Sequence, residues 1–167
     1  MYSSLIPALV LLFCPAVLSV VYVQYPDSLP SDISTDCYSA LVADIDCDES
    51  LERLLPDRYY PDSFLSVLCT EGCNAALGSY ESDIVTACGS QTYPSNTTEG
   101  DVPLSTIPQL LRYTFNQTCL YSEVDGGYCN SLFAAELGIA DDQSNLNSED
   151  IQGGGNVICD DCVLKTY

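Results

Sequence analysis

The chain has 167 residues, a length that suits one domain with a modest core, and its formal net charge at pH 7 is −20. It contains no histidine, which excludes catalytic sites and metal centres that depend on an imidazole. Four basic residues against 24 acidic ones cannot neutralise a phosphate backbone, and an anionic membrane would repel the chain. Composition therefore excludes nucleic acid as a partner.

An uncharged apolar segment opens the sequence. Val17 and Ser19 fit the −3 and −1 positions of a signal-peptidase site, so we predict a signal peptide over residues 1–19. The segment is barely long enough to cross a bilayer as an anchor. Its two prolines and the lack of flanking basic residues favour the cleaved signal. We therefore expect a secreted, extracellular protein with no membrane partner after signal cleavage.

The sequence beyond the predicted signal peptide is rich in cysteine. This density is typical of a disulfide framework formed in an oxidising compartment. The nine cysteines are Cys37, Cys47, Cys69, Cys73, Cys88, Cys119, Cys129, Cys159 and Cys162. Because nine is odd, one thiol stays unpaired, and we expect it to be Cys159 or Cys162. Predicted N-glycosylation sites at Asn96 and Asn116 agree with the secretory pathway.

Apolar periodicity predicts an all-α fold, a small disulfide-stapled helical domain over residues 35–139 that follows a linker over 20–34. The predicted helices are 35–43, 48–55, 62–88, 106–115 and 128–139. The third is either continuous or two helices with a bend, and Gly89 is its expected C-cap. Polar residues 90–102 are expected to form an exposed loop, whereas the apolar residues of 110–115 are expected in the core. Residues 140–158 form an acidic, glycine-rich segment that we predict to be disordered, before a C-terminal CxxC segment over 159–167.

Helix geometry limits the disulfide pairing. In a continuous helix Cys73 and Cys88 would lie about 22 Å apart, and the Cβ atoms of Cys69 and Cys73 about 6 Å apart, both too far to bond. We therefore expect these three cysteines to bond to other elements. Short intervening segments suggest two pairings, Cys37 with Cys47 and Cys119 with Cys129. The other pairings stay open.

Two motifs have the spacing of metal sites. Asp44, Asp46 and Asp48 alternate as in a calcium loop, but Glu49 and Leu55 stand where that loop needs Gly and Glu. We interpret these carboxylates as exposed groups at helix ends. The CxxC pair near the C-terminus lacks a second cysteine or histidine pair that would complete a zinc site, and no βαβ pattern suggests a redox motif. We expect it to serve structural disulfides.

No motif indicates catalysis, so we predict no catalytic residues, no cofactor and no metal. A glycosidase needs two paired carboxylates, and 24 acidic residues make any chosen pair uninformative. Tyr59 and Tyr60 are candidates for a sugar-stacking platform. Without tryptophan, and with tyrosines spread along the chain, we interpret most tyrosines as core or rim residues instead.

Three segments resemble the cysteine-rich region that precedes the LysM repeats of secreted fungal LysM-domain proteins. They are YYPDSFLSVLCTEGCNAALGSYESDIVTACG (59–89), TIPQLLRYTFNQTCL (106–120) and CDDCVLK (159–165). The resemblance implies an extracellular, non-enzymatic accessory module, associated with the binding of chitin or related N-acetylglucosamine polymers by LysM repeats. The Y-x-V-x-x-G-D-T-like start of such a repeat is missing from this sequence, so no sugar-binding residue carries over.

The missing repeat leaves three interpretations. The sequence is a truncated gene model or a paralogue reduced to the accessory region, with chitin or related glycans as a partner through the missing LysM repeat. Alternatively it is a stand-alone secreted interaction protein that binds a surface or host protein. A small carboxylate-based hydrolase is the least favoured class.

Overall fold

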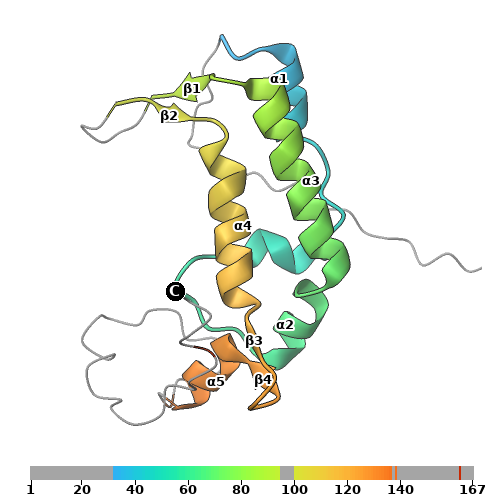
Figure 1. The fold of residues 1–167 in the computed structure, drawn as a ribbon, viewed down its shortest axis with the longest axis vertical. Coiled ribbons are helices and arrows are strands. Elements are labelled where there is room, and N and C mark those ends of the chain that lie inside the picture. The colour runs from blue at the N-terminus through green and yellow to red at the C-terminus, as the bar shows by residue number, and fades with distance from the viewer. Residues whose placement is uncertain (1–31, 95–99, 137, 139–161, 163–167) are drawn as a thin grey trace, which may run out of the picture.

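The computed structural model describes residues 32–94, 100–136, 138 and 162. Within this part of the chain the helices are α1 (Thr35–Leu41), the 3-10 helix η1 (Glu49–Arg53), α2 (Asp62–Leu68), α3 (Glu71–Cys88), α4 (Thr106–Thr118) and α5 (Cys129–Glu136) (Figure 1). Two short antiparallel pairs accompany them, β1 (Thr92–Tyr93) with β2 (Val102–Pro103) and β3 (Tyr121–Ser122) with β4 (Gly127–Tyr128). The predicted helical, disulfide-stapled fold class is confirmed.

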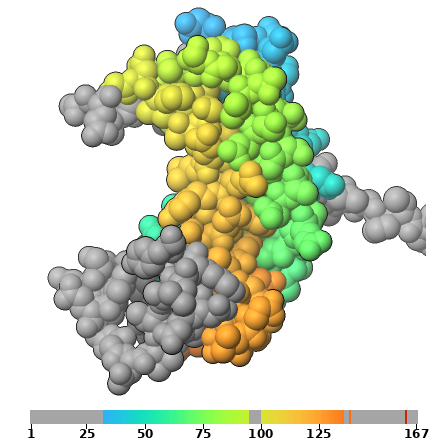
Figure 2. Space-filling view, in the orientation of Figure 1, coloured from blue at the N-terminus to red at the C-terminus, as the bar shows by residue number. Residues whose placement is uncertain are grey.

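Helices α3 and α4 run antiparallel and form the framework of the fold (Figure 1). In the space-filling view, their residues, green for α3 and yellow to orange for α4, lie side by side along the molecule (Figure 2). The Thr70 side chain accepts the Cys73 N–H and starts α3, and Gly89, with φ +55°, ends it. Helix α1 packs against α3, where the Tyr80 hydroxyl donates to the Leu41 carbonyl over 2.8 Å. Leucine, isoleucine and cystine side chains from α1, η1, α2, α3 and α4 fill one core.

Four disulfides join these elements. They are Cys37–Cys88, Cys47–Cys73, Cys69–Cys119 and Cys129–Cys162. Three of the cysteines, in or beside α3, therefore bond to other elements, as predicted. The suggested pairing of Cys37 with Cys47 is wrong, because these residues bond to Cys88 and Cys73, at opposite ends of α3.

The suggested pairing of Cys119 with Cys129 is also wrong. Both residues flank the β3–β4 hairpin, but Cys119 faces the α2–α3 junction and bonds Cys69, whereas Cys129 bonds Cys162. Because Cys162 is paired, Cys159 is the remaining candidate for the odd thiol. Cys159 lies outside the described residues, so its free thiol stays a prediction.

Several local expectations are decided or changed. The region 62–88 forms two helices, which is one of the two predicted alternatives, and the break falls at Cys69, where the chain leaves helical geometry before Thr70 caps α3. The segment expected as an exposed loop over 90–102 contains β1 and part of β2. In α4, Leu110 and Tyr113 are 58% and 62% exposed, so only part of its apolar sequence faces the core.

Other predictions fall on residues that the structure does not describe. These are the signal peptide over 1–19, most of the linker, Asn96, the acidic segment 140–158 and the C-terminal segment apart from Cys162. Among the residues that are described, no helix has the length and apolar character needed to span a membrane.

Candidate functional site

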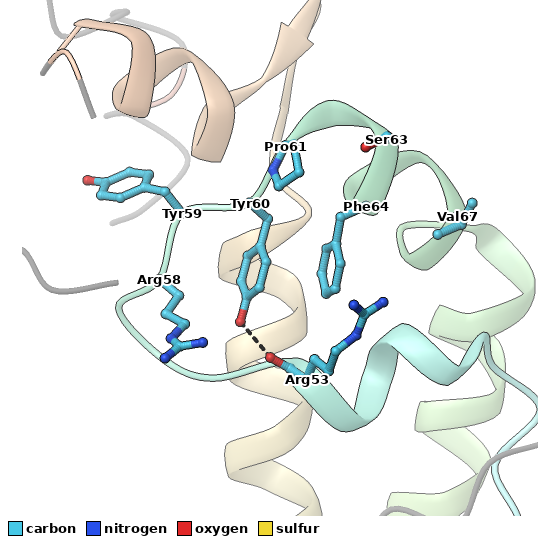
Figure 3. Close-up of a pocket in the computed structure, with 8 residues that line it drawn as sticks. All are labelled: Arg53, Arg58, Tyr59, Tyr60, Pro61, Ser63, Phe64 and Val67. Atoms are coloured by element: carbon cyan, nitrogen blue, oxygen red, sulfur yellow. Dashed lines mark hydrogen bonds between the residues drawn. The ribbon is translucent and has the colours of Figure 1, made fainter. Parts of the chain in front are cut away.

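A cleft of about 430 Å³ lies between η1, the loop after it and α2. We call it the arginine cleft (Figure 3). Its lining residues are Arg53, Arg58, Tyr59, Tyr60, Pro61, Ser63, Phe64 and Val67. The volume falls within the range of small-molecule sites, about 300–1,000 Å³.

The wall formed by η1 is fixed by capping and by a buried hydroxyl. Asp48 accepts the Ser50 N–H over 2.9 Å and caps η1, and this backbone hydrogen bond is the main reason that the pKa of Asp48 is lowered. At the other end of η1 the Tyr60 hydroxyl donates to the Arg53 carbonyl and accepts the Leu55 N–H, each over 2.8 Å. These bonds hold the chain on both sides of the cleft in one arrangement.

Helix α5 fixes the loop from the opposite side. The Asn130 side chain accepts the Tyr60 N–H over 2.7 Å and donates to the Arg58 carbonyl over 2.7 Å. One asparagine thus satisfies a donor and an acceptor of a loop that is 70 residues away in sequence. The side chains of this loop are therefore presented by a backbone that is anchored at both ends.

An aromatic stack forms the back of the cleft. The rings of Tyr60 and Phe64 lie 4.2 Å apart, between centroids, with an interplanar angle of 10°. The Arg53 guanidinium lies 5.3 Å from the Phe64 centroid, in the range of a cation–π interaction. In Figure 3 the Tyr59 side chain points away from this stack. The Phe64 ring therefore already packs against two other groups of the protein, the Tyr60 ring and the Arg53 guanidinium.

The cleft gathers positive charge in an acidic protein. Arg53 and Arg58 are two of the four basic residues in the whole sequence. Burial raises the pKa of the Tyr60 hydroxyl, while the Leu55 N–H and both guanidinium groups act to lower it. Both positive charges are therefore close enough to the Tyr60 hydroxyl to stabilise a negative charge there.

The cleft holds two residues that the sequence had singled out. Tyr60 is 8% exposed and its hydroxyl already has two partners, so it does not offer a free platform to a sugar ring. Tyr59 is half-buried, and burial together with the Asp57 carboxylate raises its pKa. The sequence analysis did not single out Arg53 and Arg58. A usable signal was present, because these two residues are half of all basic residues and flank one turn.

A second groove lies between α1 and α3 and carries three aspartates. Asp44, Asp46 and Asp83 line it, and all three are exposed to solvent. Asp48 instead caps η1, in agreement with its interpretation as a carboxylate at a helix end. Within the described ranges no group of Cys, Asp or Glu side chains could hold a metal ion.

Asn116, one of the two predicted glycosylation sites, lies in α4 with its side chain exposed. The sequon's threonine, Thr118, is 5% exposed. Glycosylation of Asn116 stays a prediction, and the folded geometry implies that a glycan would have to be added before Thr118 is buried.

Comparison with known proteins identifies relatives over most of the chain. The family described as "secreted LysM effector N-terminal domain" matches residues 21–134. A secreted LysM effector of Verticillium dahliae, Vd5LysM, is 41% identical over 98 residues, which are 58% of this chain and 14% of that protein. A LysM domain-containing protein of Arthroderma benhamiae is 31% identical over 128 residues, 77% of this chain and 23% of that protein.

A third relative carries a different description. The non-secreted LysM effector LysM19 of Penicillium expansum is 28% identical over 127 residues, 74% of this chain and 10% of that protein. No solved structure matches the chain significantly. The chain thus spans less than a quarter of the length of these curated relatives. The family match confirms the predicted resemblance and extracellular localisation, and the chain belongs to the family of secreted LysM effector N-terminal domains.

Proposed function

We propose that the chain is a non-catalytic accessory module of a LysM effector. In this proposal it works beside LysM repeats that bind chitin, and it does not bind chitin itself. The main support for the proposal is that the aromatic rings in the arginine cleft already pack against other groups of the protein.

Chitin is a neutral polymer, and sugar sites usually pair an open aromatic face with converging polar groups. In the arginine cleft, Tyr60 covers one face of Phe64 and the Arg53 guanidinium lies over the same ring. The two arginines add positive charge to the cleft, but an uncharged, acetylated sugar cannot form an ion pair with them. The cleft is therefore a poor match for N-acetylglucosamine.

The arrangement of the carboxylates also argues against a hydrolase. None of the side chains that line the arginine cleft is an acid. The aspartates of the second groove are exposed. A general acid in a glycosidase needs an environment that keeps its proton at neutral pH, commonly an apolar pocket. Exposed carboxylates in water lack that environment.

The test is a pull-down with insoluble chitin. The chain from residue 20 onward is compared with the same chain fused to the LysM repeats of the Verticillium relative, and with those repeats alone as a control. We expect the fusion and the repeats to be retained, the chain alone to stay in the supernatant, and no reducing sugar to appear. Tight retention of the chain alone would overturn the accessory role, and released reducing sugar would favour a hydrolase.

A further inference from the structure

The positive charges of this protein are distributed unevenly. Arg112 pairs with Glu81 over 2.8 Å, across α3 and α4. Arg53 and Arg58, by contrast, both line the arginine cleft. Within the described part of the chain, neither of their guanidinium groups forms an ion pair or a hydrogen bond with another residue. The cleft thus contains two cations whose donors the described fold does not use.

The protein restrains the guanidinium group of Arg53 and the backbone of Arg58. The Arg53 guanidinium lies over the Phe64 ring, 5.3 Å from its centroid, which limits the positions it can adopt. The Arg58 backbone is fixed through its carbonyl, which accepts from Asn130. A guanidinium presents several N–H donors in a planar fork that matches a carboxylate in a bidentate manner. The site is therefore partly organised for an oxyanion before any ligand arrives.

The other residues that line the cleft determine which chemical group the ligand can carry beside its negative charge. Phe64, Pro61 and Val67 give the cleft an apolar side, and Val67 is 48% exposed. Burial of an apolar group against these side chains would add to the ion pair. A ligand that combines one negative group with a flat apolar body fits both parts of the lining.

The net charge of the protein limits the charge of the ligand. A chain with a formal charge of −20 repels anions, and a dianion is repelled more strongly than a monoanion. Contacts inside the cleft are close, whereas the surrounding acids act over distances that salt screens, with a Debye length of about 8 Å at physiological ionic strength. A monoanion thus gains most from two guanidinium groups at the smallest repulsive cost.

We propose that the arginine cleft binds an organic monocarboxylate with a flat apolar body, such as an aryl carboxylate. The carboxylate pairs with Arg53 and Arg58, and the apolar body lies against the part of the apolar side that Tyr60 and Arg53 do not cover, beside Pro61 and Val67. This inference does not depend on the absence of chitin binding. A carboxylate site and a chitin site would be detected with different ligands.

The experiment is isothermal titration of benzoate into the chain from residue 20 onward. Benzamide serves as the neutral analogue, and inorganic phosphate as the more highly charged anion. Arg53→Gln and Arg58→Gln remove the donors. Arg112→Gln is the matched control, because it removes the same charge from α4, where Arg112 does not line the cleft. The fold uses the backbone carbonyls of Arg53 and Arg58, so these variants are expected to fold, which thermal melting verifies.

We expect benzoate to bind, and either substitution in the cleft, Arg53→Gln or Arg58→Gln, to weaken its affinity at least tenfold. The control Arg112→Gln should change the affinity less than twofold. Benzamide and phosphate should bind at least tenfold more weakly than benzoate. The proposal is overturned if benzoate does not bind, or if benzamide or phosphate binds as tightly as benzoate. It is also overturned if Arg112→Gln weakens binding as much as the substitutions in the cleft.

Discussion

The Cys69–Cys119 disulfide offers a quantitative test of how this fold is stabilised. It joins the α2–α3 junction to the end of α4 across a sequence separation of 50 residues. In the chain-entropy description, a cross-link over such a loop stabilises the folded state by about 4 kcal/mol relative to the open chain. Both cysteines are half-buried, so replacement by serine adds little cavity cost. We expect the Cys69→Ser/Cys119→Ser variant to lose about 4 kcal/mol of unfolding free energy.

The measurement is urea denaturation followed by circular dichroism, without reductant. The Cys129–Cys162 disulfide provides the contrast, because its 33-residue separation includes the segment 140–158 that the sequence predicts to be disordered. A cross-link that restrains a loop disordered in both states changes their difference little, so its removal should cost less than about 1 kcal/mol. A loss below about 1 kcal/mol for Cys69→Ser/Cys119→Ser, or equal losses for both variants, would refute this reasoning.

Three further outcomes are expected. Gly78→Ala in α3 should stabilise the fold by about 0.5–1 kcal/mol in thermal melting, because alanine favours a helix interior and its Cβ meets the Arg112 guanidinium at an ordinary 3.7 Å. Gly89→Ala, at φ +55°, should instead destabilise the fold by about 1 kcal/mol. The opposite signs for the two variants would contradict the helix boundaries. Because burial raises the pKa of Tyr60 in the folded state, the stability that it contributes is complete below about pH 10 and is lost as pH rises through the folded value. In a pH titration followed by absorbance at 295 nm, part of the tyrosine ionisation should occur only at the pH at which the protein unfolds. Ionisation of all tyrosines in one step while the protein stays folded would contradict this. Edman sequencing of the secreted protein should begin at Val20, next to the start of the family match at residue 21; an intact Met1 would favour a membrane anchor.

Local rules predicted much of the helical fold. Apolar spacing indicated a helix or two bent helices over 62–88, and Gly89 ends α3 with a positive φ as expected of a C-cap. The exposed Leu110 and Tyr113 could not be told from core residues, because α4 has apolar side chains around more than one face. Periodicity identifies a helix, but it does not say how many of its faces are covered.

Disulfide pairing required information that sequence distance does not contain. Cys37 and Cys47 are near in sequence, yet α1 lies along α3 and carries Cys37 to the end of α3 that holds Cys88. The helix-length argument was sound for Cys73 and Cys88, which lie in one continuous helix, α3. It did not apply to Cys69, which lies at the break before α3, although Cys69 too bonds to another element. Choosing their partners depended on helix packing, which a single sequence does not give.

The arginine cleft was not predicted for a related reason. Its members come from η1, the following loop and α2, and the loop is held by Asn130 of α5. Composition showed how rare basic residues are, and this rarity could have drawn attention to Arg53 and Arg58. The loop that carries Arg58 and Tyr60 is held by the long-range hydrogen bond from the Tyr60 N–H to Asn130, which no local sequence pattern predicts.

The proposed function requires that this module does not recognise chitin. The most direct measurement is a heteronuclear NMR titration of the ¹⁵N-labelled chain from residue 20 onward with a soluble N-acetylglucosamine hexamer. We expect no concentration-dependent shift of any backbone amide, including those of Tyr59, Tyr60 and Phe64 in the arginine cleft. Saturable shifts that cluster on one surface would contradict it and would place a chitin site within these helices.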